Sequence, residues 1–431
     1  MKLVIIAGGK GTRLGLNDIP KPMVDIGGKP LLELQIANAK AHGITEVYIL
    51  TGYLAAPIKK HFGTGIKFGV NISYIEEDQP LGTAGAIKQL EGKVRGRFLV
   101  FYGDVMINMD LSSLIAFDGK ASSIATIVVH PNDHPHDSDL INLDGAGRVL
   151  NLYSKPHVVG AYYPNLVNAG AYILSEEVFK YIKEAEFSDF GRTVFPSLLQ
   201  AGETIRGYKT AEYLKDIGTP ERLEKVRKDW LDGSIQRRNK AGKRPAIFMD
   251  RDGTLIEDVD LLCKAEDLKL FAFSAPAIKK INNSDFLLFL VTNQPVVARN
   301  LCDLSAVRGF HNKLETLLGE QGVYLTDIYV CPHHPDKGYP GENAAYKIDC
   351  GCRKPKTGMI DQAVLEYNVD LTSSWFIGDT TIDIQTGINA GTRTVLVKTG
   401  KGGKDGKYNC APHFTCDNLA LAVDYVLNQP H

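Results

Sequence analysis

The chain has 431 residues, 44% of them hydrophobic and 23% charged, and its formal net charge is −1. The length predicts two or three domains, and the composition is typical of a soluble globular protein. The small net charge argues against nucleic acid or a membrane surface as a partner, and no run approaches the roughly 20 apolar residues of a membrane span. We therefore expect a cytoplasmic protein, and the chain leaves open whether it forms a homo-oligomer.

The first element is a buried strand predicted from Lys2 to Ala7, which runs into the Gly-rich stretch 8–15. After a strand, such a turn lets backbone N–H groups approach phosphates closely, and Lys10 and Arg13 add positive charge. The spacing fits neither a Walker A loop nor a dinucleotide fingerprint. A tight turn without a ligand is the alternative.

Strands and helices then alternate along the first half of the chain. A helix is predicted over 30–42 and strands over 46–50, 72–75 and 98–101, and a second Gly-rich turn at 79–86 opens another helix. Alternation of this kind predicts an α/β fold with a doubly wound, mostly parallel sheet.

Six motifs in this half resemble those of the sugar-phosphate nucleotidyltransferases over about residues 1 to 225. They are GGKGTRLG at 8–15, PKPM at 20–23, QPLGTAGA at 79–86, Gly-Asp at 103–104, Asn-Ala-Gly at 168–170 and Lys-Asp-Ile-Gly-Thr-Pro at 215–220. The resemblance implies a Rossmann-like domain that takes an NTP and a sugar phosphate and uses Mg²⁺. It assigns the triphosphate to Gly8, Gly9, Gly11, Thr12, Arg13 and Lys21, the last two as catalytic cations, the base to Gln79 and Gly85 in the turn with Gly82 and Thr83, the sugar to Asn168 and Gly170, its phosphate to Lys155, and Mg²⁺ to Asp104 and Asp216.

The chemistry of nucleotidyl transfer agrees with these residue types. The sugar phosphate attacks the α-phosphorus and expels pyrophosphate, so two anions must be brought together by cations and a metal ion, without a covalent nucleophile. Each residue also has a plain structural alternative. Lys155 could lie in an exposed loop, Asn168 could form a turn before a strand, and Asp216 could be an ordinary turn residue.

The segment 231–244 is polar and basic, which is typical of a linker between domains. A basic tract for nucleic acid is the alternative, although a solvated loop has the same composition. We expect a transferase domain over 1–230, a linker over 231–244 and a second domain over 245–431.

The second domain opens with an apolar strand at 246–249 that ends in Asp250-Arg-Asp252-Gly-Thr. An acidic pair after a strand lies at the carboxyl edge of a sheet, where open α/β folds hold ligands. The two carboxylates could hold Mg²⁺, or one could attack phosphorus while the other handles protons. An Asp-Gly-Thr turn without chemistry is the alternative.

Three further motifs follow in order and resemble those of the haloacid dehalogenase (HAD) phosphatases, which implies a second Rossmann-like domain. They are Thr292-Asn-Gln after an apolar run, Arg353-Lys-Pro, and Gly378-Asp with Asp383 beyond it. The resemblance assigns roles as follows: Asp250 is the nucleophile that forms an aspartyl-phosphate, Asp252 the acid/base, Thr292 and Asn293 the phosphoryl-binding residues, Lys354 the neutralising cation, Arg353 a substrate contact, and Asp250, Asp379, Asp383 and the Asp252 carbonyl the Mg²⁺ site.

The cysteines form a separate pattern. All seven lie beyond residue 262, and an odd number in a cytosolic-looking chain argues against a disulfide framework. Cys331-Pro-His333 and Cys350-Gly-Cys352 are two close pairs separated by a loop, which suits a tetrahedral structural zinc site. Buried free cysteines beside a surface histidine are the alternative.

The stretches CPHHP and CRKPKTGM resemble the heptose 1,7-bisphosphate phosphatases, with the histidinol-phosphate phosphatases as relatives. The chain departs from that pattern at Pro295-Val296 and at Asn300, where the family has Ser-Gly and Gly. Together the two resemblances imply removal of the 7-phosphate from a heptose bisphosphate and then transfer of a nucleotide, GMP from GTP, for a surface glycan. The alternatives are a hexose-phosphate transferase, a histidinol-phosphate phosphatase, and a half that only binds sugar phosphates.

Overall fold

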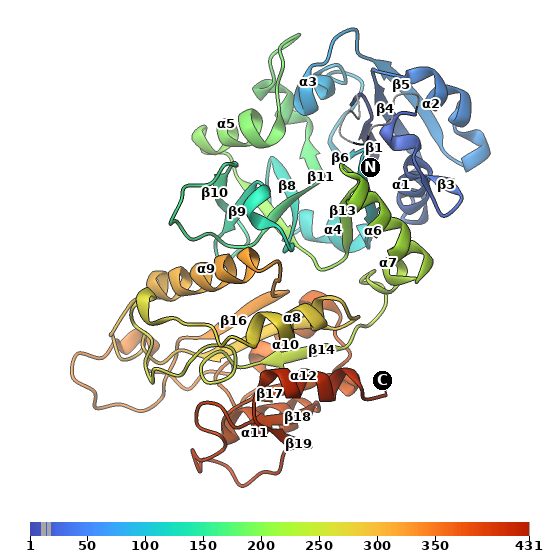
Figure 1. Cartoon of the computed structure of the whole chain (residues 1–431). Helices are drawn as coiled ribbons and strands as arrows, with labels where there is room; N and C mark the ends of the chain where they lie inside the picture. The colour runs from blue at the N-terminus through green and yellow to red at the C-terminus, as the bar shows by residue number, and fades with distance from the viewer. Residues whose placement is uncertain (10–13, 15–18, 431) are drawn as a thin grey trace. The chain divides into compact units, whose positions relative to one another are not determined.

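The computed structural model describes residues 1–9, 14 and 19–430, and the chain divides into two compact units, each of α/β architecture as predicted. Figure 1 shows the helices and strands of both units, with labels on many of them. The first unit comprises Met1–His130, Ser138–Pro156 and Leu166–Lys240, and the second Pro131–Asp137, His157–Asn165 and Ala241–His431.

A nine-stranded mixed sheet forms the first unit. Its centre is parallel, because β1 pairs with both β4 and β6, and β4 pairs with β5. Strand β11 then pairs antiparallel with β6 and leads to the remaining strands, an extension that the periodicity of the sequence did not predict. The strands are β1 (Lys2–Ile6), β4 (Glu46–Thr51), β5 (Asn71–Glu76), β6 (Arg97–Tyr102), β8 (Ala125–His130), β9 (Leu140–Leu143), β10 (Val149–Tyr153), β11 (Val167–Ser175) and β12 (Ile205–Lys209).

Both faces of this sheet are covered, as a doubly wound fold requires. Leu3 and Ile5 of β1 point to one apolar cluster and Val4 to another, which follows from the period of two along a strand. Helices α1, α2 and α4 contribute to the first cluster, and α3 and α5 to the second. These helices are α1 (Leu31–Ala41), α2 (Ala55–Phe62), α3 (Gly82–Lys88), α4 (Leu111–Asp118) and α5 (Phe195–Gln200).

A two-stranded ladder beside this sheet, β7 (Val105–Asn108) with β13 (Tyr213–Asp216), brings two predicted metal ligands together. Asp216 pairs with Val105, the neighbour of Asp104, and the Ile217 N–H donates to the Asp104 carbonyl over 2.9 Å. Helices α6 (Pro220–Leu231) and α7 (Ser234–Arg237) follow, and the first unit continues to Lys240. Part of the stretch predicted as a linker is therefore folded, with Ile235 fully buried.

The second unit contains a six-stranded sheet in the order β16-β15-β14-β17-β18-β19, and every pair in it is parallel. The predicted strands that lead to Asp250, Thr292 and Gly378 are three adjacent strands of this sheet, β14, β15 and β17, so their carboxyl ends meet at one edge. The strands are β14 (Ala246–Met249), β15 (Leu287–Asn293), β16 (Asp327–Cys331), β17 (Trp375–Gly378), β18 (Arg393–Val397) and β19 (Phe414–Cys416).

Helices lie on both sides of this sheet as well (Figure 1). Helices α8, α9 and α12 share one apolar cluster with Ile247 and Met249, while α10 and α11 contact the sheet through other strand positions. Phe248, Phe289 and Phe376 face away from that cluster, and the rings of Phe248 and Phe289 stack with centroids 5.4 Å apart. The helices are α8 (Ser274–Asn282), α9 (Leu304–Glu320), α10 (Gly358–Tyr367), α11 (Thr381–Ala390) and α12 (Leu419–Leu427).

Among the described residues, no helix has the length and apolar character needed to cross a membrane.

Candidate active sites

Three carboxylates and a lysine meet at the carboxyl edge of the second sheet. Lys354 Nζ lies 2.9 Å from Asp250 Oδ1 and 2.6 Å from Asp383 Oδ1, and only 3% of the lysine side chain is exposed. Burial, opposed by Lys354 and supported by Asp383 and Asp252, raises the pKa of Asp250 to about 7. Burial alone would lower the pKa of Lys354, but Asp250 and Asp383 hold it above its usual value.

Asp379 completes this group, since oxygens of Asp250, Asp379 and Asp383 all lie within 4.8 Å of one another. Its Oδ2 accepts the Lys401 N–H over 2.6 Å, whereas its Oδ1 is buried and has no hydrogen-bond partner among the described residues. Burial, with Asp383 and Asp250 nearby, raises the pKa of Asp379 to about 8. A Cβ at Gly253, where φ is +73°, would lie 2.5 Å from Asp379 Oδ2, so this approach requires glycine.

Asp383 is held from two sides. Its Oδ2 accepts both the N–H and the O–H of Thr380 in a capping box at the start of α11. Its Oδ1 accepts from Lys354. These bonds fix Lys354 beside Asp250.

Asp252 lies in a second network, centred on Arg251. Both oxygens of Asp252 accept from the Arg251 guanidinium at 2.9–3.2 Å, and the Gln294 amide donates to Asp252 Oδ2 over 3.0 Å. The same Gln294 amide nitrogen donates to Thr292 Oγ1 over 2.8 Å. The predicted residues Asp252 and Thr292 are therefore joined through a glutamine.

The two remaining predicted contacts, Asn293 and Arg353, flank Lys354. Asn293 accepts the Lys354 N–H over 3.0 Å and donates to its carbonyl over 3.2 Å. Arg353 donates to the His333 carbonyl over 3.0 Å, which ties it to the cysteine-bearing loop.

A group of cations lies beside this loop. The Arg299 guanidinium is 4.4 Å and Lys347 Nζ 4.8 Å from the centroid of the Tyr339 ring. Burial together with the charges of Arg353, Lys347 and Arg299 lowers the pKa of the nearby His334. We call Arg299, Lys347 and Arg353 the loop cations; Glu342, 3.2 Å from Lys347 Nζ, is a carboxylate among them.

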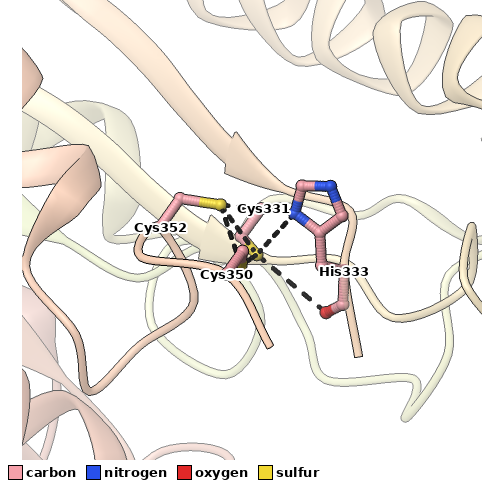
Figure 2. Close-up of side chains that lie close together, drawn as sticks. All are labelled: Cys331, His333, Cys350 and Cys352. Carbon is pink, nitrogen blue, oxygen red and sulfur yellow. Dashed lines mark hydrogen bonds between the residues drawn. The ribbon is translucent and has the colours of Figure 1, made fainter. Parts of the chain in front are cut away.

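The two cysteine pairs come together as predicted (Figure 2). The sulfur atoms of Cys331, Cys350 and Cys352 lie 3.2–3.5 Å apart, and His333 Nδ1 is 3.4 Å from Cys352 Sγ and 3.8 Å from Cys331 Sγ. A hydrogen bond with the Cys331 thiol lowers the pKa of Cys352 to about 5. The structure thus brings four atoms that could ligate a metal ion close together.

In the first unit, the two predicted acidic ligands are each paired with a cation. Lys21 Nζ lies 3.0 Å from Asp104 Oδ2, and Lys21 is buried. Arg222 Nη1 donates to both oxygens of Asp216 at 2.8 and 2.9 Å. Asp104 and Asp216 flank the adjoining ends of β7 and β13, so carboxylates and cations converge at one edge.

Glu77 joins the two Gly-rich loops of this unit. A Cβ at Gly8 would lie 2.6 Å from Glu77 Oε2, and the Leu81 N–H donates to Glu77 Oε1 over 3.2 Å. No described residue lies within 4 Å of a Cβ built at Gly9, and Gln79 is exposed. The predicted residues Gly11, Thr12 and Arg13 lie outside the described part of the chain.

The second Gly-rich turn packs against residues 186–190. Added Cβ atoms at Gly82, where φ is +76°, and at Gly85 would lie 2.4 and 2.6 Å from the carbonyl oxygens of Ser188 and Glu186. Thr83 donates to Asp189 over 2.8 Å. These glycines therefore permit a close approach of two backbones.

The predicted sugar contacts lie near Asp139. The Asn168 N–H donates to the Asp139 carbonyl over 3.2 Å, and the Lys155 N–H donates to Asp139 Oδ1 over 3.1 Å. Gly170 has φ of +68°, and a Cβ there would lie 2.9 Å from the Tyr102 ring. The structure thus brings Lys155, Asn168 and Gly170 into one region.

Known proteins resemble both parts of the chain, in agreement with the two resemblances predicted from the sequence. The family model described as nucleotidyl transferase matches residues 2–233, which is more than half of the chain. The chain belongs to the nucleotidyltransferase family. For the second part, a model described as HAD-hydrolase-like matches residues 351–422.

Two curated relatives match different parts of this nucleotidyltransferase–phosphatase chain. Mannose-1-phosphate guanylyltransferase of Mycobacterium tuberculosis is 32% identical over 59% of the chain and 69% of that protein. D-glycero-D-manno-heptose-1,7-bisphosphate 7-phosphatase of Thermosynechococcus vestitus is 34% identical over 42% of the chain and 95% of that protein. Among solved structures, HddC from Yersinia pseudotuberculosis is 29% identical, covers 53% of the chain and 99% of that protein, and has a TM-score of 0.47.

Motif reading missed several residues of both sites. In the phosphatase unit these are Arg251, Gln294 and His311, and in the transferase unit Asp139, Asp189 and Arg222. Arg251 and Gln294 stand inside the motifs, so their positions were the available signal. Asn300, which departs from the family glycine, has φ of +57°, a region that asparagine tolerates better than most residues.

Proposed function

We propose that the chain catalyses two consecutive steps of nucleotide-sugar synthesis. The phosphatase unit removes the 7-phosphate of a heptose 1,7-bisphosphate, and the transferase unit then joins the heptose 1-phosphate to GMP from GTP, for a surface glycan. The observation that carries this proposal is the presence of both sites on one chain, together with the 34% identity of the second part to a protein named as a heptose bisphosphatase.

In the first step, an Asp250 oxygen attacks the phosphorus of the 7-phosphate. The bond to the sugar oxygen breaks, that oxygen takes a proton from Asp252, and an aspartyl-phosphate forms. Water then attacks this phosphorus, the Asp250 carboxylate leaves, and Asp252 takes the proton of the water. Lys354, 2.9 Å from Asp250, offsets negative charge, and Thr292 and Asn293 bind phosphoryl oxygens.

The residues at this edge suit Mg²⁺, which supplies charge neutralisation at the phosphoryl oxygens. Asp379 Oδ1 is buried without a hydrogen-bond partner among the described residues. A bound hard cation would satisfy this oxygen. Asp250 and Asp379 would hold the ion with the Asp252 carbonyl. Asp383, occupied by Thr380 and Lys354, would stand behind them as a positioning carboxylate.

Cys331, His333, Cys350 and Cys352 fit a structural Zn²⁺. Around a tetrahedral ion with Zn–S bonds of about 2.3 Å, ligand atoms lie about 3.8 Å apart. The separations of 3.2–3.8 Å among these ligands are close to that value. Four protein ligands leave no open position, so the ion would stabilise the loop that carries Arg353.

In the second step, the heptose 1-phosphate attacks the α-phosphorus of GTP and pyrophosphate leaves. Lys21 and Arg13 would bind the triphosphate with the backbone of Gly8, Gly9, Gly11 and Thr12. Gln79, Gly82, Thr83 and Gly85 would contact the base, Asn168 and Gly170 the sugar, and Lys155 its phosphate. The carboxylates of Asp104 and Asp216 suit Mg²⁺ as ligands. On binding them, the metal would replace Lys21 and Arg222 as their partners.

The loop cations favour a sugar bisphosphate over histidinol phosphate as the phosphatase substrate. Histidinol phosphate carries a positive charge, so its site should offer carboxylates. Arg299, Lys347 and Arg353 lie around His334 and Tyr339 in this loop, with two carboxylates, Glu342 paired to Lys347 and Asp336 3.9 Å from His334 Nδ1. Excess positive charge suits the second phosphate of a bisphosphate.

The test measures phosphate release by the full chain with Mg²⁺ from both anomers of heptose 1,7-bisphosphate, histidinol phosphate and hexose phosphates, with Asp250→Asn as the blank. We expect a heptose bisphosphate to be the best substrate. Pyrophosphate release is then measured with each NTP, and GTP should be preferred. Turnover of another ester without any heptose bisphosphate activity would refute the substrate assignment.

A further inference from the structure

Gln294 links two residues of the proposed phosphatase site. It follows β15, and only 2% of its surface is exposed. Its amide nitrogen donates to Thr292 Oγ1 over 2.8 Å and to Asp252 Oδ2 over 3.0 Å. Its amide oxygen accepts from Arg251 Nη2 over 2.8 Å.

Arg251 fixes which way the Gln294 amide faces. A guanidinium can only donate hydrogen bonds, so the amide oxygen must face it and the NH₂ must face Asp252 and Thr292. Arg251 is itself fully buried, and its Nη1 lies 3.2 Å from His311 Nε2, which must therefore accept. Burial and Arg251 lower the pKa of His311 well below its usual value, in agreement with a neutral ring.

In this arrangement every hydrogen bond that reaches Asp252 from Arg251 and Gln294 is donated to its carboxylate. A carboxyl group that accepts hydrogen bonds and donates none is ionised, and the ionised form is the one that can take up a proton. Of the two steps at Asp250, hydrolysis of the aspartyl-phosphate is the one in which Asp252 takes up a proton.

We propose that Gln294, oriented by Arg251, is a positioning residue for the second half of the phosphatase reaction. It holds Asp252 as the base for the attacking water. In that step the water oxygen bonds to phosphorus, the bond from phosphorus to Asp250 breaks with its electron pair on the carboxylate, and the water proton moves to Asp252. This inference rests on the proposed phosphatase function.

The test uses para-nitrophenyl phosphate with the full chain and Mg²⁺. Its leaving group needs little help from an acid, so release of para-nitrophenolate reports formation of the aspartyl-phosphate. Intact-protein mass after a rapid acid quench reports the phosphorylated fraction. The variants are Gln294→Met, which removes all three bonds, and Gln294→Glu, which keeps the acceptor facing Arg251 and replaces the donor facing Asp252.

We expect both variants to slow hydrolysis of the phosphorylated enzyme about 100-fold, the scale of a positioned base. Formation of the aspartyl-phosphate should slow by less than about 10-fold, the share expected from loss of the bond to Thr292. A burst of para-nitrophenolate approaching one per site should therefore appear, and the phosphorylated fraction should rise. Gln362→Met is the matched control, because Gln362 is exposed and donates to Glu366 on its own helix over 2.9 Å.

Equal slowing of both steps, or turnover without accumulated phosphoenzyme, would overturn the role of Gln294 while leaving the phosphatase function standing. No release by the unmodified protein above the Asp250→Asn blank would overturn both. Melting curves show that the variants are folded; if Gln294→Met unfolds, Gln294→Glu, which retains a partner for the buried Arg251, decides the result.

Discussion

The two sites handle their acidic residues differently. In the phosphatase unit, Asp250, Asp379 and Asp383 lie within reach of one ion, and a buried lysine pairs with both Asp250 and Asp383. The pKa values of Asp250 and Asp379 rise to about 7 and 8. In the transferase unit, Asp104 and Asp216 each have a cation of their own, Lys21 and Arg222. A covalent step needs a crowded, buried group of charges, whereas joining two anionic substrates needs cations that a metal can displace.

The largest effects should come from removing one acid from each site. Asp250→Asn should lower the rate of phosphate release more than about 1,000-fold, because the nucleophile is lost. It should leave the rate of pyrophosphate release unchanged. Asp104→Asn should lower pyrophosphate release about 100-fold or more and spare the phosphatase. Both are measured on the full chain with each substrate separately.

Each variant is the control for the other. Loss of both activities in either variant, with a normal melting curve, would contradict the separation of the two sites.

The sequence predicted which acidic residues belong to each site, but it did not predict which cation each one pairs with. Strand-end motifs located Asp250, Thr292 and Asp379, because carboxyl ends of parallel strands meet at one edge. Ion pairing depends on tertiary contacts that no local pattern encodes. Lys354 pairs with Asp383 as well as with Asp250, and Arg222 pairs with Asp216.

Fold prediction shows the same division. The parallel strands of both units follow from short continuous apolar runs, whereas the antiparallel joining of β11 to β6 depends on a long-range register. Ile235 of α7 is one of few apolar residues in a polar stretch, so its burial in the cluster that holds Leu223 and Val226 of α6 could not be read from composition.

The next prediction concerns Mg²⁺ binding and pH in the phosphatase unit. Since the pKa values of Asp250 and Asp379 are raised to about 7 and 8, both hold protons at pH 6 that Mg²⁺ must displace. The Kd for Mg²⁺ should therefore rise roughly 100–1,000-fold from pH 8 to pH 6, measured by calorimetry with proton release in two buffers.

Asp379→Asn serves as the control for that titration. It should bind Mg²⁺ weakly at both pH values and release fewer protons. An affinity that does not change between pH 8 and pH 6 in the unmodified protein would contradict the assignment of these carboxylates to the ion.

Loss of the proposed zinc ion should affect one unit only. Cys352→Ser should lower bound zinc from about one per chain to none, measured by plasma mass spectrometry. It should destabilise the phosphatase unit by about 3 kcal/mol or more, a fall in Tm of about 10 °C, without change in pyrophosphate release. Cys410→Ser, outside the cluster, is the control, and equal zinc in both variants would contradict the site.

The smallest effect should come from His311, whose pKa is lowered by burial and by Arg251. Above about pH 6.5 both folded and unfolded forms are neutral there. Below that pH this histidine is protonated in the unfolded chain but stays neutral in the folded chain. The free energy of unfolding therefore falls by up to about 1.4 kcal/mol per pH unit.

Denaturant unfolding between pH 7 and pH 5 measures this slope. His311→Gln should reduce it, and His136→Gln, at an exposed position, should leave it unchanged. An identical slope in His311→Gln would show that the ring is not the group responsible.

The central claim is that one chain performs the two steps in order, and phosphorus NMR on one sample tests it most directly. The full chain is mixed with heptose 1,7-bisphosphate, GTP and Mg²⁺, in parallel with Asp104→Asn and Asp250→Asn. The account predicts that the 7-phosphate signal disappears before pyrophosphate appears, that Asp104→Asn stops at heptose 1-phosphate, and that Asp250→Asn leaves the bisphosphate intact. Pyrophosphate formation by Asp250→Asn at the rate of the unmodified chain would contradict it, because the transferase would then use the bisphosphate directly.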